Sequence, residues 1–242
     1  MKQNIPFNKP YTFKSDLNYI KQVFKKQKFT DGYFQQKCEK LIKRKINSNF
    51  IALTQSCTSA LEIIMLLIKL KKDDEVIMPS YTFTSTANSV ILRGAKPVFV
   101  DVNPVDINLN PRLVEKKINK KTKAIVPVHW SGRICDMKTI KKIAKKHSLF
   151  IVEDACHAIS AHDDKKKFAG TFGDTGCFSF HPLKNLNVWG DGGIITTNNK
   201  KIYEKLKLMR NHGLINRDNC KIYGYNSRLD TVQAAVALEM LK

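Results

Sequence analysis

Lys184 and Asp154 are the two side chains whose place in the sequence suggests reaction chemistry. Lys184 follows the apolar run 177–180 in an aromatic and proline-containing turn. Partial loss of water there lowers the pKa of a lysine and makes its amine a usable nucleophile, although a lysine in a turn is usually a surface residue. Asp154 follows the run 149–153. A carboxylate there is costly to bury without a cationic partner such as a protonated ring nitrogen. The alternative is a helix N-cap.

Two further segments could hold an anion and a flat ring. Residues 56–60, Ser-Cys-Thr-Ser-Ala, open a predicted helix, and the free N–H groups of a helix N-terminus suit a phosphate. The alternative is a plain Ser/Thr cap. Residues 79–85 are rich in aromatic side chains, which could stack on a ring but more often belong to the core. Phosphate cradle, aromatic plate, ring-nitrogen carboxylate and reactive amine are the parts that a pyridoxal phosphate (PLP) site needs.

Seven short apolar runs predict the strands that position these side chains. They are residues 50–54, 75–78, 97–101, 123–128, 149–153, 177–180 and 193–197. Helical patterns lie between them at 58–70, 86–92, 113–118 and 136–146. Runs that are apolar on both faces are typical of strands covered by helices. The alternation predicts an α/β domain with a mostly parallel seven-stranded sheet, whose ligands bind at the carboxyl ends of the strands.

Nine segments, spread from residue 4 to about residue 235, occur in the order found in one protein family. They are Asn-Ile-Pro-Phe-Asn at 4–8, Ser-Cys-Thr-Ser-Ala-Leu at 56–61, Asp-Glu-Val-Ile-Met-Pro-Ser-Tyr-Thr-Phe at 74–83, Gly-Ala-Lys-Pro-Val-Phe-Val-Asp at 94–101, Val-Pro-Val-His-Trp-Ser-Gly at 126–132, Glu-Asp-Ala-Cys-His-Ala at 153–158, the stretch 173–185, Gly-Asp-Gly-Gly at 190–193 and Tyr-Asn-Ser-Arg-Leu-Asp at 225–230. In these motifs the chain resembles the DegT/DnrJ/StrS sugar aminotransferases of fold-type I. The resemblance implies the large PLP-binding domain of that fold, an α/β/α sandwich.

The resemblance implies roles for four residues around the cofactor ring. Lys184 would bind PLP covalently and then shuttle a proton. Asp154 would pair with the pyridine nitrogen and keep it protonated. Phe83 would stack on one ring face, and His157 would lie beside the ring and its 3-hydroxyl group.

Four other residues match the family's phosphate contacts. Cys57, Thr58 and Ser179 would hold the phosphate within one subunit. Asn226 matches a residue that usually reaches the phosphate from the partner subunit. The resemblance therefore implies a homodimer whose sites are completed across the interface.

The implied reaction is transfer of an amino group from an amino-acid donor, glutamate in most of the family, to a nucleotide-linked keto-sugar. This chemistry serves amino-sugar or surface polysaccharide biosynthesis. Lys184 argues against the family branch that carries His at this position and performs dehydration. We favour amination at C-3 over C-4, because the segment around Lys184 resembles the C-3 members. The alternative is a non-catalytic protein, a truncated or regulatory relative that still binds PLP.

The domain organisation expected from the resemblance is incomplete. Residues 1–228 would form the PLP-binding domain, with a helical N-terminal segment at about 1–48. Residues 229–242 would begin the helix that leads to a smaller C-terminal domain, which we expect to be largely missing. The polar N-terminus and the short apolar runs predict neither a signal peptide nor a membrane segment, and so a cytoplasmic protein.

Composition raises one competing function. The 242 residues include 42 Lys+Arg and 21 Asp+Glu, giving a net charge of +21, which is a reason to consider nucleic-acid binding. Only seven of the basic residues are Arg, and the 35 Lys are scattered along predicted helix faces. This pattern favours a solvated surface and no nucleic-acid partner. The six Cys form no C-x-x-C pair and no zinc-like group with His, so we expect reduced thiols and no metal site.

Overall fold

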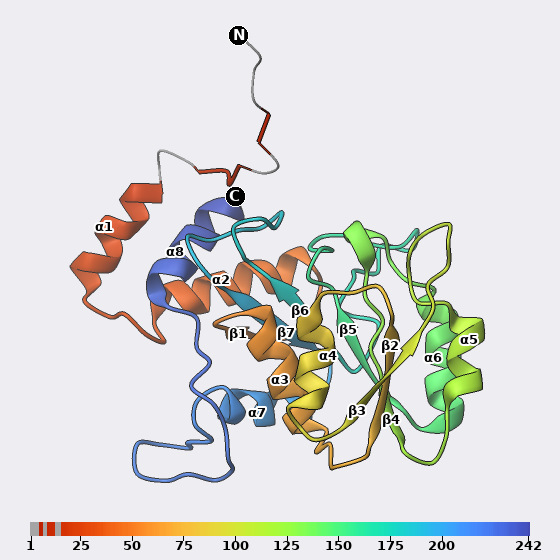
Figure 1. Cartoon of the computed structure of the whole chain (residues 1–242). Coiled ribbons are helices and arrows are strands. Elements are labelled where there is room, and N and C mark those ends of the chain that lie inside the picture. The colour runs from red at the N-terminus through yellow and green to blue at the C-terminus, as the bar shows by residue number, and fades with distance from the viewer. Residues whose placement is uncertain (1–4, 7–8, 13–15) are drawn as a thin grey trace.

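The computed structural model describes residues 5–6, 9–12 and 16–242, and places a seven-stranded sheet between layers of helices (Figure 1). The strands are β1 (Phe50–Thr54), β2 (Glu75–Pro79), β3 (Lys96–Val100), β4 (Thr122–Ile125), β5 (Phe150–Asp154), β6 (Thr175–Ser179) and β7 (Gly193–Thr197). The α-helices are α1 (Asp16–Lys26), α2 (Tyr33–Lys45), α3 (Cys57–Leu67), α4 (Thr84–Ile91), α5 (Pro111–Lys117), α6 (Met137–His147), α7 (Lys200–Met209) and α8 (Thr231–Met240).

The predicted mostly parallel sheet is confirmed. Its strand order is β1-β7-β6-β5-β4-β2-β3. The four pairings from β3 to β6 are parallel, whereas β7 is antiparallel to both of its neighbours, β1 and β6. The parallel strands therefore all end at one edge of the sheet, where the predicted site residues follow them.

Side chains alternate between the two faces of the sheet, as the pleat of a strand requires. Val152 and Cys177 pack with α3, α4 and α7 in one apolar cluster. Ile151, one residue before Val152, packs with α5 and α6 on the opposite face. Phe178 packs with α1, α2 and α8, also on that opposite face. This two-sided burial explains why the strands read as continuous apolar runs.

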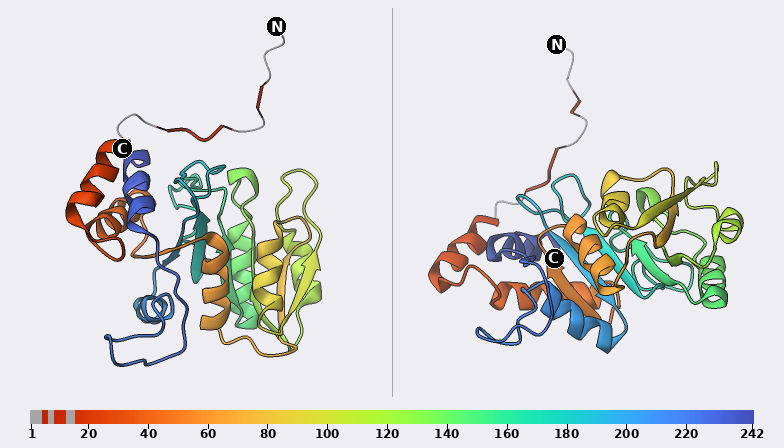
Figure 2. Two further views of the ribbon diagram at one scale, coloured as in Figure 1. Left: turned by 60° about the vertical axis from the view of Figure 1, so that its left-hand side comes forward. Right: turned by 60° about the horizontal axis from the view of Figure 1, so that its bottom comes forward.

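The N-terminal and C-terminal helices form one group. Helix α8 packs against both α1 and α2, and α1 lies beside α8 in both views of Figure 2. Helix α8 buries a continuous run from Ala234 to Leu238, because helices cover it on more than one side. The segment between α7 and α8 forms a long loop that projects from the body of the protein (Figure 2).

The N-terminal segment expected to be helical over about 1–48 contains α1 and α2, whereas residues 5–6 and 9–12 lie outside helices; the other positions before Asp16 lie outside the described residues. Helix α7 was not predicted. No helix in the part of the chain that the structure describes is long and apolar enough to cross a membrane. The proposed division at residue 228 stays a prediction.

Candidate active site

A cavity of about 390 Å³ lies at the carboxyl ends of the parallel strands, where ligands bind in open α/β sheets. Six of the eight residues that the sequence singled out line it. They are Cys57, Thr58, Phe83, Asp154, Ser179 and Lys184. The wall also contains residues that the sequence reasoning missed, namely Leu61, Ser85, Thr86, Cys156, His181, Leu183 and Asp191, together with Ser56.

The N-terminus of α3 supplies one end of the cavity. The Ser56 hydroxyl caps the helix by accepting a hydrogen bond from the Ser59 N–H at 3.0 Å. The N-cap alternative thus holds for Ser56, while Cys57 and Thr58 begin the helix and line the cavity. The Thr58 and Ser85 hydroxyls lie 2.9 Å apart. Helix N–H groups and neighbouring hydroxyls together suit a phosphate.

Gly193 allows α3 to begin this close to the sheet. A Cβ built on Gly193 would lie 2.5 Å from the Ser56 carbonyl carbon and 2.6 Å from the Cys57 nitrogen. Both are backbone atoms, so a flexible side chain cannot move aside to relieve the clash. Glycine at the start of β7 therefore sets the distance between β7 and the first turn of α3.

Asp154 is only 3% exposed, yet its carboxylate borders the cavity. Thr86 donates to its Oδ2 at 2.9 Å, and the Cys156 N–H donates to its Oδ1 at 3.3 Å. The Thr82 and Thr86 hydroxyls are also 2.9 Å apart. Since Thr86 has one proton to donate, Thr82 donates to Thr86 and Thr86 to Asp154. Asp154 does not cap a helix, because the residues after it form turns.

Lys184 lies half-buried in the turn that follows β6. Its backbone N–H donates to the His181 carbonyl at 2.8 Å, and the Asn187 amide donates to the Lys184 carbonyl at 3.4 Å. Ser179 ends β6, and its hydroxyl oxygen accepts from the His181 N–H at 3.2 Å. The Ser179 proton therefore stays available for a ligand in the cavity.

His157 and Asn226 do not line the cavity. Burial, and then the positive charge of Lys184, lower the pKa of His157. Its Nδ1 is buried and finds no hydrogen-bond partner among the described residues. Asn226 is exposed in the long loop before α8, where it forms a bridge with Asn211. Its predicted role in a partner subunit stays a prediction.

A buried network behind the site was also missed. Glu153 points to the opposite face from Asp154, and its carboxylate accepts from the His129 ring at 2.8 Å. Backbone N–H groups of Gly170, Phe172 and Gly173 also donate to it. These bonds fix the segment leading into β6, the strand that ends at Ser179. Glutamate inside a strand is the signal in the sequence, because an unpaired buried charge is costly.

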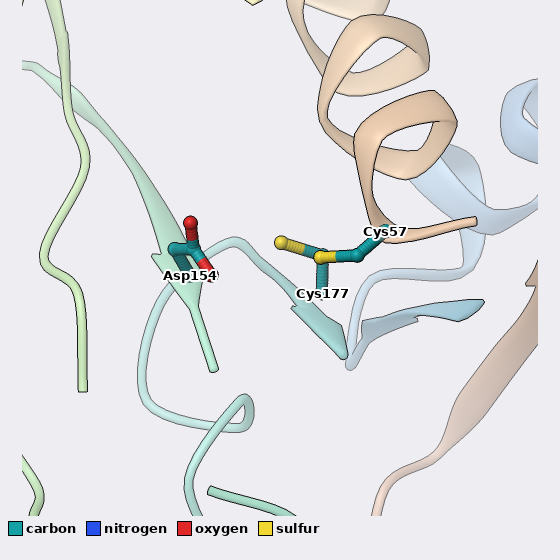
Figure 3. A group of neighbouring side chains, drawn as sticks. All are labelled: Cys57, Asp154 and Cys177. Carbon is teal, nitrogen blue, oxygen red and sulfur yellow. The ribbon is translucent and has the colours of Figure 1, made fainter. Parts of the chain in front are cut away.

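The site also gathers sulfur atoms that the sequence gave no reason to group. One ligating atom from each of Cys57, Asp154 and Cys177 lies within 4.8 Å of the others (Figure 3). The hydrogen bond with Cys57, and then burial, raise the pKa of Cys177. The three residues come from α3, the end of β5 and β6.

The residues present fit PLP. Buried Asp154 forms no salt bridge among the described residues, and its carboxylate suits a protonated ring nitrogen. Hydroxyls of Thr58, Ser85 and Ser179 surround the cavity near a helix N-terminus. Phe83 is 71% exposed beside them, an aromatic surface available to a ring. The Lys184 amine completes the set.

Comparison with known proteins shows that the chain is similar to aminotransferases. The DegT/DnrJ/EryC1/StrS aminotransferase family pattern matches residues 10–242. A 3-oxo-glucose-6-phosphate:glutamate aminotransferase from Bacillus subtilis is 36% identical over 229 residues, 93% of this chain and 51% of the relative. A UDP-N-acetyl-3-dehydro-alpha-D-glucosamine 3-aminotransferase from Acidithiobacillus ferrooxidans is 42% identical over 181 residues, 75% of this chain and 49% of the relative.

Solved structures share the fold. The crystal structure of NtdA from Bacillus subtilis, with the bound cofactor PMP, superposes with a TM-score of 0.87 at 33% identity. That match covers 100% of this chain and 57% of the solved one. The chain thus spans about half the length of the curated relatives it matches.

Proposed function

Because the chain belongs to the DegT/DnrJ/EryC1/StrS aminotransferase family, we propose that it serves PLP-dependent transfer of an amino group from glutamate to a nucleotide-linked keto-sugar. The observation that carries this proposal is the convergence of Lys184, Asp154 and the Thr58 and Ser179 hydroxyls on one cavity. The names of two relatives support the finer points: one names glutamate, and the other a UDP-linked 3-dehydro sugar.

Each side chain has a proposed task. PLP, when bound, supplies a ring that withdraws electrons from the carbon attached to the transferred nitrogen. Asp154 holds the proton on the ring nitrogen, and Thr86 holds Asp154. The Thr58 and Ser179 hydroxyls and the α3 N-terminus bind the phosphate. The Lys184 Nζ takes a proton from the donor's α-carbon and returns a proton later in the cycle.

Two further parts of the proposal concern the whole protein. We place Asn226 at the cofactor phosphate of a second subunit, which makes the working unit a homodimer. Asn226 is exposed in the segment between α7 and α8, which leaves its side chain accessible to a second subunit. All six cysteines are free, which fits a reducing cytoplasm.

Absorbance spectroscopy tests the cofactor assignment. Purified protein given PLP should show a visible band that Lys184→Ala lacks and that Lys205→Ala, a change on an exposed face of α7, retains. Borohydride reduction should then fix the cofactor mass on the peptide containing Lys184. A wild-type protein without the band, or a band that survives in Lys184→Ala, would overturn the assignment.

The amino-transfer step needs its own assay. Glutamate added to the PLP-loaded protein should release 2-oxoglutarate in one stoichiometric turnover, and Lys184→Ala should release none. PLP binding without any 2-oxoglutarate would favour the non-catalytic alternative.

A further inference from the structure

We propose that Cys57, Cys177 and Asp154 form a binding site for a thiophilic divalent cation such as zinc, and that the cation and the cofactor exclude each other. The first support is proximity: the two sulfur atoms and a carboxylate oxygen all lie within 4.8 Å of one another (Figure 3). Two thiolates bound tetrahedrally to one zinc at about 2.3 Å lie roughly 3.8 Å apart. Small side-chain movements would therefore bring all three ligands to one ion.

The fold holds the three ligands from rigid elements. Asp154 and Cys177 are register partners on the parallel strands β5 and β6, so their side chains leave the same face of the sheet. Cys57 begins α3, which packs against that face. Ligands placed by strands and a helix are better positioned than ligands on loops.

The carboxylate already has the support that metal sites show. The Thr86 hydroxyl and the Cys156 N–H donate to its two oxygens, at 2.9 and 3.3 Å. Metal-bound carboxylates are typically oriented by such outer hydrogen bonds. Cys57 and Asp154 also border the cavity of about 390 Å³, which leaves room for a water molecule as the fourth ligand.

Binding is balanced by proton release. Cys57 and Cys177 each lose a thiol proton to solvent when their sulfur binds the cation, because only the thiolate ligates. Asp154 contributes one negative charge without losing a proton. Two thiolates and a carboxylate then surround a divalent ion, and two protons leave for each ion bound.

Exclusion of the cofactor follows from the shared ligand, and this part rests on the proposed function. A divalent cation on Asp154 offsets the negative charge of the carboxylate and repels the positive charge of a protonated pyridine nitrogen, so the cation and the cofactor compete for Asp154. Cys57 also opens the helix whose N-terminus we assign to the phosphate. The cation therefore binds the cofactor-free protein and keeps it cofactor-free.

Cadmium titration of the full cofactor-free chain, kept reduced with a phosphine, tests the site. Cadmium should give a near-ultraviolet thiolate absorption band that saturates at one equivalent. Cys57→Ser and Cys177→Ser should each weaken cadmium binding at least about tenfold. Even the loss of a group that only orients a metal ligand weakens metal binding about 10- to 100-fold. Cys220→Ser removes an exposed thiol outside the site and should leave the titration unchanged. Circular dichroism checks that each variant folds.

The outcomes separate the two proposals. A wild-type protein without the band, or a band unchanged in Cys57→Ser, would overturn the cation site. If Cys177→Ser does not fold, the cation site is still tested by Cys57→Ser and Asp154→Asn, each of which should bind cadmium more weakly than the wild type. Prior PLP should suppress the cadmium band, and unhindered cadmium binding to the PLP-loaded protein would overturn the exclusion. A cadmium band in a protein that shows no PLP spectrum would leave the cation site standing and remove the cofactor assignment.

Discussion

At the scale of single residues, the shorter of the two hydrogen bonds to the Asp154 carboxylate comes from the Thr86 hydroxyl. Thr86→Val keeps the shape of the side chain but removes the donor to Oδ2, at 2.9 Å. A buried oxygen without its donor costs about 1–3 kcal/mol. We expect weaker PLP binding and slower release of 2-oxoglutarate, by up to about tenfold for each 1.4 kcal/mol lost at that step.

The neighbouring residue gives the matched control for Thr86→Val. Thr84 is exposed at the start of α4, so Thr84→Val should match the wild type in PLP titration and in the turnover assay. Equal behaviour of the two variants would show that Thr86 does not position Asp154.

The residues that the sequence could identify were those with unusual surroundings. A carboxylate after an apolar run and a lysine in an aromatic turn stood out, and Asp154 and Lys184 do line one cavity. Thr86 could not be found this way, because threonine is ordinary in a helix and its partner lies 68 positions away. The placing of Cys57 beside Cys177 depends on strand register and helix packing, which no local pattern encodes.

At the scale of elements, the contact between α3 and β7 is set by Gly193. Gly193→Ala would place its Cβ 2.6 Å from the Cys57 nitrogen, so α3 or β7 must shift. Overpacking of this kind costs about 1–3 kcal/mol. We expect Gly193→Ala to unfold at a lower urea concentration than the wild type. It should also bind PLP more weakly, because the α3 N-terminus moves.

Another glycine serves as the control for Gly193→Ala. The atoms nearest to a Cβ on Gly32 belong to the flexible side chain of Lys28. Gly32→Ala should therefore leave PLP affinity unchanged, whatever it does to α2. PLP affinity that stays normal in Gly193→Ala would contradict the role given to this contact.

The packing of α2 against β1 predicts a pH dependence. Burial raises the pKa of Glu39 above its ordinary value of 4.5, although the nearby Arg210 charge opposes the shift. The folded state therefore binds the Glu39 proton more tightly than the unfolded state does. The contribution of this Glu39 proton to the free energy of unfolding is fully present below pH 4.5, and it is lost as the pH rises through the pKa of Glu39 in the folded state.

Glu39→Gln removes this titration while keeping an acceptor for the Leu53 N–H, 3.4 Å away. The free energy of unfolding of Glu39→Gln, relative to wild type, should therefore increase from pH 4.5 towards neutrality. Urea titrations across this range measure the difference. Glu204→Gln, on an exposed face of α7, is the control, and a flat difference for Glu39→Gln would contradict the prediction.

Element positions were more predictable than their boundaries. All seven predicted strands occur, because strands buried on both faces read as apolar runs. The run 123–128 ends earlier, as β4 stops at Ile125, and Pro127 lacks the N–H that would extend the ladder. Helix α7 was missed although its apolar residues Ile202, Leu206 and Met209 have the spacing of one helix face, and Leu206 and Met209 are buried.

At the scale of the whole molecule, the net charge of +21 raises the question of a nucleic-acid partner. Several lysines are engaged locally, as in the pairs Lys96–Asp73 and Lys146–Glu115 at 2.7 Å. Exposed pairs of this kind contribute little to stability. The expectation of no nucleic-acid partner stays a prediction, and salt-sensitive retention of DNA in a shift assay would contradict it.

The projecting loop leads to the last prediction, which asks whether Asn226 serves a second subunit. Lys184→Ala and Asn226→Ala would each be inactive alone if both residues are needed at every site. In a mixed dimer, one site would carry both changes and the other neither, provided that Asn226 acts across the interface. Equal mixing with free exchange makes half of the dimers mixed, so activity should recover to about a quarter of wild type.

A loop acting within its own subunit gives a different result. Each site of a mixed dimer would then carry one damaged residue, and mixing would recover nothing. The assay is release of 2-oxoglutarate by the PLP-loaded mixture over repeated turnovers with a keto-sugar acceptor, and sedimentation confirms that dimers form. A sample of Lys184→Ala mixed with Lys184→Ala,Asn226→Ala is the control, because neither arrangement leaves it an intact site. Recovery with the first mixture alone requires Asn226 to act in the partner's site.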